Sequence, residues 1–259
     1  MPFAEVNNVR IHYELTGDSA LPVLVFSHSL GVNFSMWDAQ LSAVASSSCV
    51  LRYDTLGHGK SSTPAGPYSA TDLGTDVVGL LDALKIEQAN FCGLSMGGVI
   101  GQWLAINAPT RIRKLVLAST AAKIGTQETW NTRIATVEQQ GLQSIIPGTL
   151  ERWFTADFRG SAPEIVADIA TSLEATTAQG YLACCAAIRD ADFRANIAEV
   201  TAPTLVISGS EDPVTTPEDG RFLAQNIAGA KFVELPAAHL SNVESAREFN
   251  AALLNFLTV

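Results

Sequence analysis

The sequence lacks the features that mark several large classes of protein. None of its 259 residues belongs to an apolar run long enough to cross a bilayer, and residues 1–6 have no basic or long apolar stretch of a signal peptide. Acidic residues outnumber basic ones by 26 to 16, which gives a net charge of −10 and argues against nucleic acid and anionic membranes as partners. We therefore expect a cytoplasmic protein that binds neither of them.

Cysteine is scarce and shows no CxxC spacing; the four cysteines are Cys49, Cys92, Cys184 and Cys185. This usage is typical of reduced thiols in a cytosolic protein. No group of histidine, cysteine and acidic residues has the spacing of zinc ligands, so we expect no metal.

The chain does contain a regular alternation of strand-like and helix-like segments. Six short segments are predicted to be buried strands: 22–27, 49–53, 89–92, 113–118, 203–208 and 231–235. Helical spacing of apolar residues separates most of them, which predicts an α/β fold with a mostly parallel sheet flanked by helices. Residues 3–15 alternate in polarity around an Asn-Asn turn and predict an antiparallel hairpin at the start.

The alternation is interrupted between residues 121 and 200, where short helical segments follow one another without a convincing strand. It then resumes, and a helix at 243–257 closes the chain. The sequence thus predicts one α/β core, residues 1–120 and 201–259, with a helical lid inserted at 121–200. Ligands bind at the carboxyl ends of the strands in such sheets, so the lid would cover that crevice.

The motif Gly93-x-Ser95-x-Gly97 follows the strand at 89–92 and precedes a helical pattern. It has the form of a nucleophile elbow, a strained turn that exposes a serine hydroxyl. Glycine fits on both sides because strand and helix nearly touch there and leave no room for a Cβ. The first N–H groups of the helix face any negative charge that develops at the serine. Ser95 is therefore the candidate nucleophile; the alternative is a glycine-rich turn with an idle serine.

A serine nucleophile needs a base, and the base needs a third group that orients it. His239 is the candidate base because it follows the last predicted strand, whereas His12 lies in the first hairpin and is expected to face solvent. The acid should lie between Ser95 and His239, just after a strand, where the sequence offers Glu211 and Asp212. We prefer Asp212, because it is shorter and precedes a proline.

The tetrahedral intermediate of such chemistry needs two N–H donors. One is expected from the backbone of Met96, directly after the nucleophile. The other should come from the loop after the strand at 22–27, where Leu30 is the candidate and Ser29 the alternative. His28 and His58 also follow strands and should lie near the crevice.

Five ordered motifs together resemble the α/β-hydrolase fold superfamily over the whole chain. They are His28-Ser29-Leu30-Gly31, Asp54-x-x-Gly57-His58-Gly59-x-Ser61, Gly93-Leu94-Ser95-Met96-Gly97-Gly98, Gly209-Ser210-Glu211-Asp212-Pro213 and Ala238-His239. Within it, the chain is most similar to the 3-oxoadipate enol-lactonases of bacterial aromatic catabolism. Four segments support that narrower resemblance: 33–37, 123–133, 151–155 and 180–190. His28 is a departure, because asparagine is common there in the family.

The resemblance implies an acyl-enzyme mechanism without a cofactor. Ser95, deprotonated by His239, would attack the lactone carbonyl. The N–H groups of Leu30 and Met96 would hold the oxyanion while the ring opens and expels an enol oxygen. Water activated by His239 would hydrolyse the acyl-enzyme, and the enol would tautomerise to 3-oxoadipate.

The implied substrate carries a carboxylate, so a cation in the lid should bind it within this acidic protein. Arg133 lies three residues after Trp130 and shares its helix face. We expect Arg133 to contact the carboxylate and Trp130 to pack on the lactone ring. The alternative is that Trp130 belongs to the lid core and Arg133 is a solvated charge.

Other activities could use Ser95, Asp212 and His239 on the same scaffold. A generic carboxylesterase, a cofactor-free perhydrolase and a hydrolase that cleaves C–C bonds are rival enzymes. A ligand receptor that keeps its triad is a rival from a different class, because fold does not fix function.

Overall fold

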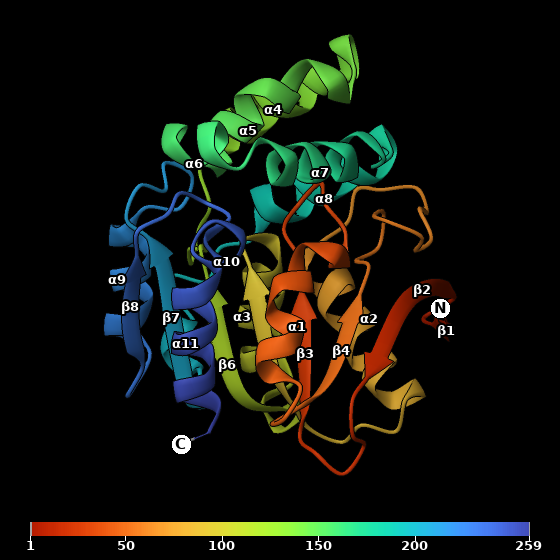
Figure 1. Ribbon diagram of the computed structural model, residues 1–259. Helices are drawn as coiled ribbons and strands as arrows, with labels where there is room; N and C mark the ends of the chain where they lie inside the picture. The colour runs from red at the N-terminus through yellow and green to blue at the C-terminus, as the bar shows by residue number, and fades with distance from the viewer. Residues whose placement is uncertain (1, 259) are drawn as a thin grey trace.

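An eight-stranded sheet forms the centre of the computed structural model, which describes residues 2–258 (Figure 1). The strand order is β1-β2-β4-β3-β5-β6-β7-β8. The first two strands, β1 (Phe3–Val6) and β2 (Val9–Thr16), form the predicted antiparallel hairpin, and β2 pairs antiparallel with β4. The other pairings are parallel; they join β3 (Val23–Ser27), β4 (Cys49–Tyr53), β5 (Ala89–Leu94), β6 (Ile112–Ala118), β7 (Thr204–Gly209) and β8 (Lys231–Leu235). The predicted mostly parallel sheet is confirmed.

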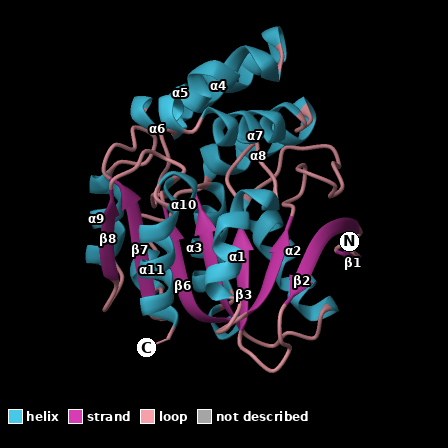
Figure 2. Ribbon diagram, viewed as in Figure 1, coloured by secondary structure: helices cyan, strands magenta, loops and turns pink. Residues whose placement is uncertain are grey.

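Helices cover both faces of this sheet (Figure 2). On one face α1 (Asp38–Val44) packs against α11 (Ala246–Leu257), and on the other α2 (Ala70–Ala83) packs against α3 (Met96–Asn107). Near the last two strands lies α9 (Pro217–Asn226). The strands between these layers are accordingly buried, and every residue of β5 and β7 is inaccessible to solvent or nearly so.

Five α-helices, with two short 3-10 helices, lie between β6 and β7 in the segment that we call the helical insertion (residues 121–200). They are α4 (Gln127–Gln140), α5 (Ile146–Trp153), α6 (Ala156–Ser161), α7 (Pro163–Glu174) and α8 (Ala178–Asp190). Figure 1 shows them above the carboxyl ends of the strands, and residues 121–200 contain no strand. The division of the chain into a core and a lid remains a prediction.

The predicted helix at 243–257 is two helices. The first, α10 (Ser241–Glu244), ends before Ser245, and α11 begins after it. Ser245 has φ −113° and ψ 49°, outside the helical region. Its hydroxyl donates a hydrogen bond of 2.7 Å to the Pro236 carbonyl, which fixes this break in the helix.

The prediction that His12 faces solvent is wrong. His12 is only 2% exposed, and its Nδ1 lies 2.7 Å from Oδ2 of Asp54. The loop after β4 folds back over β2, where the His12 N–H donates to the Ser61 hydroxyl and the Asp54 N–H donates to the His12 carbonyl. The ring of Phe34 stacks on the imidazole at 5.2 Å between centroids, so the side chain is enclosed.

Within residues 2–258 no helix is long and apolar enough to cross a membrane. No group of potential ligands in that part of the chain is arranged to hold a metal ion. All four cysteines are buried and free.

Candidate active site

Ser95 occupies a sharp turn between β5 and α3, with φ 57° and ψ −110°. A positive φ is rare and strained for a residue with a side chain, and such strain is characteristic of functional sites. Glycine is required on both sides: a Cβ on Gly93 would lie 2.1 Å from the Gly97 carbonyl oxygen, and a Cβ on Gly97 would lie 2.2 Å from the Ser27 carbonyl oxygen. The structure therefore confirms the steric basis of the predicted elbow, because neither glycine position has room for a Cβ.

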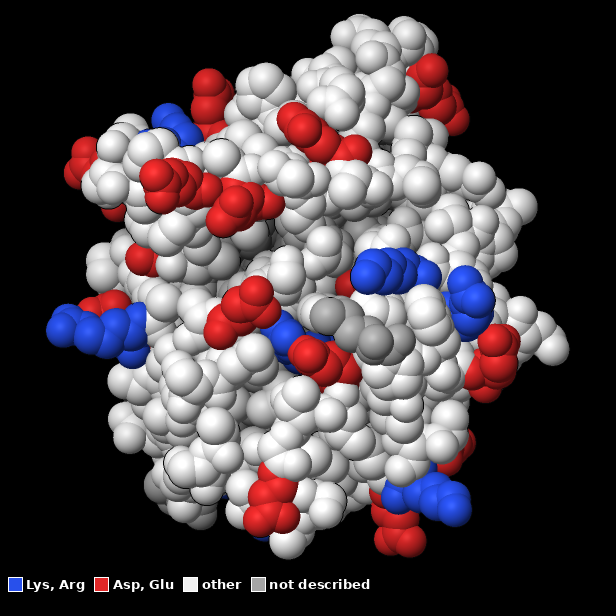
Figure 3. All heavy atoms as spheres, turned by 45° about the vertical axis from the view of Figure 1, so that its right-hand side comes forward, with Lys and Arg blue, Asp and Glu red and all other residues white. Residues whose placement is uncertain are grey.

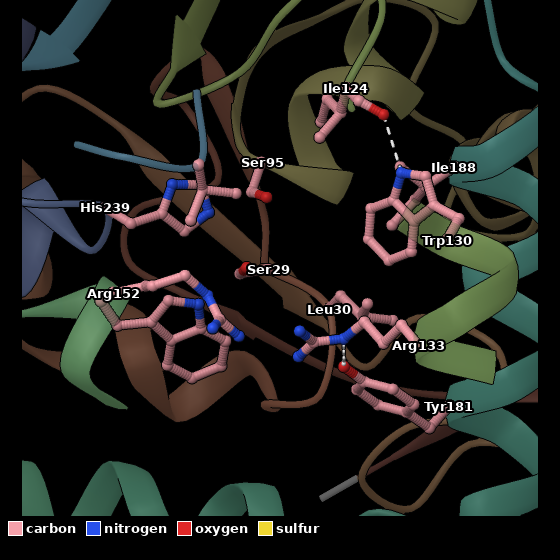
Figure 4. A pocket seen from close by; sticks show the side chains of 12 residues that line it. Ser29, Leu30, Ser95, Ile124, Trp130, Arg133, Arg152, Tyr181, Ile188 and His239 are labelled. Atoms are coloured by element: carbon pink, nitrogen blue, oxygen red, sulfur yellow. Dashed lines mark hydrogen bonds between the residues drawn. The ribbon is translucent and has the colours of Figure 1, made fainter. Parts of the chain in front are cut away.

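A pocket opens in front of Ser95, between the strand ends and the helical insertion (Figure 4). Ser29, Leu30, Ser95 and His239 line it from the core side. Residues of the helical insertion complete the wall, among them Trp130, Arg133, Arg152 and Tyr181. The structure thus brings the candidate nucleophile, the candidate base and the candidate oxyanion loop to one cavity.

His239 lies in the loop after β8, and its Nδ1 is 2.8 Å from Oδ2 of Asp212. Asp212 follows β7, and its Oδ1 accepts the N–H groups of Val214 and Thr215 at 2.8 and 3.1 Å. The Thr215 hydroxyl donates to Oδ2 at 2.8 Å. Burial by itself raises the pKa of Asp212, but the charge of His239 and these hydrogen bonds outweigh it and hold the pKa below its ordinary value.

An ionised Asp212 requires His239 to carry its proton on Nδ1, which leaves Nε2 free to accept a proton. Glu211, the other acid offered by the sequence, is exposed, and the carboxylate that reaches His239 is that of Asp212. Within residues 2–258 no hydrogen bond joins the Ser95 hydroxyl to His239. Such bonds often shorten only when substrate is bound.

The loop after β3 presents Leu30 and Ser29 to the pocket. The Ser29 N–H donates to the Met36 sulfur at 3.3 Å, whereas no acceptor within residues 2–258 receives the Leu30 N–H. Met96 is the first residue of α3, so its N–H is one of those that a helix leaves unpaired. The geometry therefore favours Leu30 over Ser29 as the partner of Met96 in an oxyanion hole.

Trp130 and Arg133 both project from α4 into the pocket. The Trp130 Nε1–H donates to the Ile124 carbonyl at 2.7 Å, which fixes the plane of the indole (Figure 4). The Arg133 Nε–H donates to the Tyr181 hydroxyl at 2.6 Å, and a terminal nitrogen donates to Thr149 at 2.9 Å. Both acceptors are neutral, so the positive charge of Arg133 has no carboxylate partner within residues 2–258.

A second arginine, which was not predicted from the sequence, lies in the same wall. Arg152 on α5 points into the pocket beside Arg133 (Figure 4), and no carboxylate in residues 2–258 pairs with it. Burial, and then the neighbouring charge of Arg133, lower the pKa of Arg152. Two neighbouring cations without a carboxylate partner have the chemistry to bind an anion.

In Figure 3, acidic side chains are the main charged groups on the upper part of the visible face, where the helical insertion lies. In a protein with a net charge of −10, the positive charge that an anionic ligand would meet inside the pocket comes from Arg133 and Arg152.

Two more histidines, His28 and His58, are buried next to this loop at 0% and 2% exposure. Burial lowers the pKa of His28, although the Asp54 carboxylate opposes that shift. Burial, and then His28, lower the pKa of His58 to about 3. Both side chains are therefore neutral at pH 7.

We expect the protein to lose stability as the pH falls from 7 to 5. The unfolded chain binds a proton on each of these histidines near pH ~6.5, whereas the folded chain binds these protons only at a lower pH, so acid favours the unfolded state. The pKa of His58 is about 3 in the folded chain, so its effect covers the pH range from ~6.5 down to about 3. Within such a range, each pH unit of acidification lowers the free energy of unfolding by up to about 1.4 kcal/mol for each group. Asp76 opposes the effect in part, because burial raises its pKa to about 6 and its folded form takes up a proton first.

Urea unfolding of the wild type and of His58→Gln between pH 5 and 7.5 measures the contribution of His58 alone. The free energy of unfolding of the variant should depend less steeply on pH than that of the wild type. Parallel curves for the two proteins would contradict a neutral, buried His58.

Comparison with known proteins agrees with the fold and this geometry. The family model described as alpha/beta hydrolase fold matches residues 22–246, and the chain belongs to this family, which confirms the predicted fold. It is 46% identical over 246 residues to 3-oxoadipate enol-lactonase 2 of Acinetobacter baylyi, covering 95% of this chain and 92% of that protein. It is 42% identical over 236 residues to 3-oxoadipate enol-lactonase 1 of that organism, covering 91% and 88%. The crystal structure of the enol-lactonase from Burkholderia xenovorans LB400 superposes with a TM-score of 0.98 at 45% identity, over 100% of both chains.

Proposed function

We propose that this protein hydrolyses the enol-lactone of 3-oxoadipate to 3-oxoadipate. The similarity to two enzymes named for that reaction, over more than nine-tenths of this chain, supports the substrate. The observation that carries the chemistry is the content of one pocket. It contains a serine on a strained elbow, a histidine bonded to a buried carboxylate, and two arginines without a carboxylate partner.

In the first half of the proposed reaction, His239 Nε2 takes the proton of Ser95 as the hydroxyl oxygen attacks the lactone carbonyl. Asp212 stabilises the imidazolium that forms and holds its ring in place. The carbonyl oxygen becomes an oxyanion, which the N–H groups of Leu30 and Met96 receive. The C–O bond of the ring then breaks, and the enol oxygen leaves with the proton from His239.

In the second half, His239 removes a proton from a water molecule, which attacks the acyl-enzyme carbonyl. The same two N–H groups stabilise the second oxyanion, and Ser95 leaves with the proton. The freed enol tautomerises to the ketone, which makes ring opening difficult to reverse. The proposed steps need only groups of this chain and water, so no cofactor is proposed.

Substrate recognition is assigned to the helical insertion, which we propose acts as a lid. The guanidinium groups of Arg133 and Arg152 would bind the free carboxylate through charge-assisted hydrogen bonds. Trp130, whose indole is held by Ile124, would pack against the lactone ring. We also propose a cytoplasmic location, which the four free cysteines support.

Arg133→Ala and Arg152→Ala should each raise KM for the enol-lactone roughly 10- to 100-fold, the range of one lost charge-assisted hydrogen bond. Hydrolysis of a neutral aryl acetate should change less than about threefold, because that ester has no carboxylate to bind. Arg194→Ala is the matched control, since Arg194 is exposed and pairs with Asp192 on the surface. Unchanged KM values for the enol-lactone in both pocket variants would show that the carboxylate binds elsewhere.

Product analysis tests the proposed activity against its rivals. The purified protein should convert many equivalents of enol-lactone into a single product, 3-oxoadipate, heavier by one water and identifiable by NMR and mass spectrometry. Two smaller products would indicate C–C cleavage, and one turnover or none would indicate a receptor. A peracid formed only when hydrogen peroxide is added, without lactone opening, would indicate a perhydrolase.

A further inference from the structure

The two buried histidines beside the oxyanion loop take no part in the chemistry proposed above. His28 begins that loop, directly after β3, and His58 lies in the loop after β4. Their rings are 5.2 Å apart between centroids, and neither makes an ion pair within residues 2–258. Burying two imidazoles costs free energy unless each nitrogen has a hydrogen-bond partner, so their partners indicate what they do.

The hydrogen bonds of His28 leave only one arrangement of its proton. Its Nδ1 lies 2.7 Å from the Ser29 carbonyl oxygen, which can only accept. Its Nε2 lies 2.9 Å from the Thr55 backbone nitrogen, whose N–H can only donate. His28 is therefore a neutral imidazole with its proton on Nδ1, and it donates that proton to Ser29.

The hydrogen bonds of His58 fix the position of its proton in the same way. Its Nε2 is 2.8 Å from the Gly31 backbone nitrogen and accepts that N–H. Its Nδ1 lies 3.3 Å from the Leu56 carbonyl and donates to it. His58 is thus also neutral with its proton on Nδ1, and it holds Gly31 through Nε2.

These contacts fix the two peptide groups on either side of Leu30. The Ser29 carbonyl and the Leu30 N–H belong to one planar trans peptide, in which they point in opposite directions. The bond from His28 to that carbonyl therefore sets the direction of the Leu30 N–H. The next peptide carries the Gly31 N–H, which donates to His58 Nε2. The Gly31 carbonyl, in the peptide after that, accepts a hydrogen bond of 2.8 Å from the hydroxyl of Thr176 in the helical insertion.

We propose that His28 and His58 are positioning residues that aim the Leu30 N–H at the oxyanion. His28 also strengthens this donor, because a hydrogen bond accepted by the carbonyl polarises the peptide and makes its N–H more positive. The inference depends on one part of the proposed function, the role of the Leu30 N–H as an oxyanion donor. It does not depend on which ester is the natural substrate.

A crossed set of four substitutions tests the proposal. The side-chain nitrogen of asparagine can take the place of imidazole Nδ1, whereas the longer glutamine side chain reaches the place of Nε2. His28 acts through Nδ1, so His28→Asn should keep the required bond and His28→Gln should lose it. His58 acts through Nε2, so His58→Gln should keep the bond to Gly31 and His58→Asn should lose it.

The readout is hydrolysis of an aryl acetate, because any ester must use the oxyanion hole. His28→Gln and His58→Asn should lower kcat roughly 10- to 100-fold, part of the 10²- to 10³-fold cost of removing one oxyanion donor, with KM within about threefold of wild type. His28→Asn and His58→Gln should stay within about fivefold of wild type in both constants. Affinity for an alkyl boronate, which becomes tetrahedral on Ser95, should fall with kcat, while affinity for 3-oxoadipate should not change.

A structural role without positioning predicts a different pattern. Equal losses in all four variants, the reverse order at either position, or a parallel loss of boronate and 3-oxoadipate affinity would overturn the proposal. If wild type hydrolyses the aryl acetate but not the enol-lactone, the proposed substrate is wrong, and the crossed pattern still decides the inference. If wild type opens the enol-lactone and the four variants behave alike, the inference is wrong and the proposed function stands.

Discussion

Ser95→Ala should lower kcat for the enol-lactone by roughly 10⁴-fold or more, because no acyl-enzyme can form without the hydroxyl oxygen. The fold should survive the change, since alanine needs the same backbone angles as the serine it replaces and fits the same space. The melting temperature and the affinity for 3-oxoadipate should therefore stay close to the wild-type values. Absorbance of the enol-lactone, thermal unfolding and calorimetric titration measure the three quantities.

Ser210→Ala is the control for this experiment. Ser210 lies in the loop after β7, two residues before Asp212, but its side chain is exposed and outside the pocket. It should retain wild-type kcat. Residual activity of Ser95→Ala within about tenfold of wild type would show that another group is the nucleophile.

Asp212→Asn should lower kcat by roughly 10³- to 10⁴-fold, although it changes only one atom of the side chain. Four hydrogen-bond donors surround the carboxylate: two N–H groups at Oδ1, and the Thr215 hydroxyl and His239 Nδ1 at Oδ2. An amide NH₂ at either position would face donors and leave them unsatisfied. The amide would also favour the tautomer of His239 with its proton on Nε2, which cannot accept the proton of Ser95.

Glu211→Gln makes the same chemical change one residue away. Glu211 is exposed, so its substitution should leave kcat and KM at wild-type values. The pair of variants separates the effect of the Asp212 contacts from the loss of one negative charge in this loop. A large loss in Glu211→Gln with a small one in Asp212→Asn would reverse the assignment of the acid.

The parts of the site that could be predicted from sequence depend on local sterics or on chain order. The elbow follows from two glycines whose Cβ positions are filled by backbone atoms of the neighbouring elements. Asp212 and His239 could be predicted because each lies in a loop that follows a strand, and the carboxyl ends of parallel strands meet at one edge of the sheet. The preference for Asp212 over Glu211 rested on its shorter side chain and on the proline that follows it.

The parts that could not be predicted depend on contacts between distant segments. His12 is enclosed by a loop that follows more than 40 residues later, so the polarity pattern of its own strand does not reveal its burial. Arg152 on α5 reaches the pocket where Arg133 on α4 donates a hydrogen bond to Thr149 on α5, a contact between separate helices of the helical insertion. The choice between Leu30 and Ser29 depended on a single contact, the bond from the Ser29 N–H to Met36.

The role of His28 shows the same limit at closer range. Its position after β3 is evident in the sequence, but its function depends on the acceptor at Nδ1 and the donor at Nε2. The second of these, the Thr55 N–H, belongs to another loop. Side-chain identity alone therefore gives no indication that His28 controls the peptide of its neighbour.

The most direct test of the whole account is the ratio of kcat/KM for 3-oxoadipate enol-lactone to kcat/KM for a simple aryl acetate. Both esters would use Ser95, Asp212 and His239, and only the lactone offers a carboxylate to Arg133 and Arg152. We predict a kcat/KM of about 10⁴ M⁻¹s⁻¹ or more for the lactone, within the usual range for enzymes on their own substrates. The kcat/KM for the acetate should be lower than this value by at least ~100-fold, because the acetate cannot form the charge-assisted hydrogen bonds to the two arginines. Equal values, or a preference for the acetate, would contradict the account and identify a generic esterase.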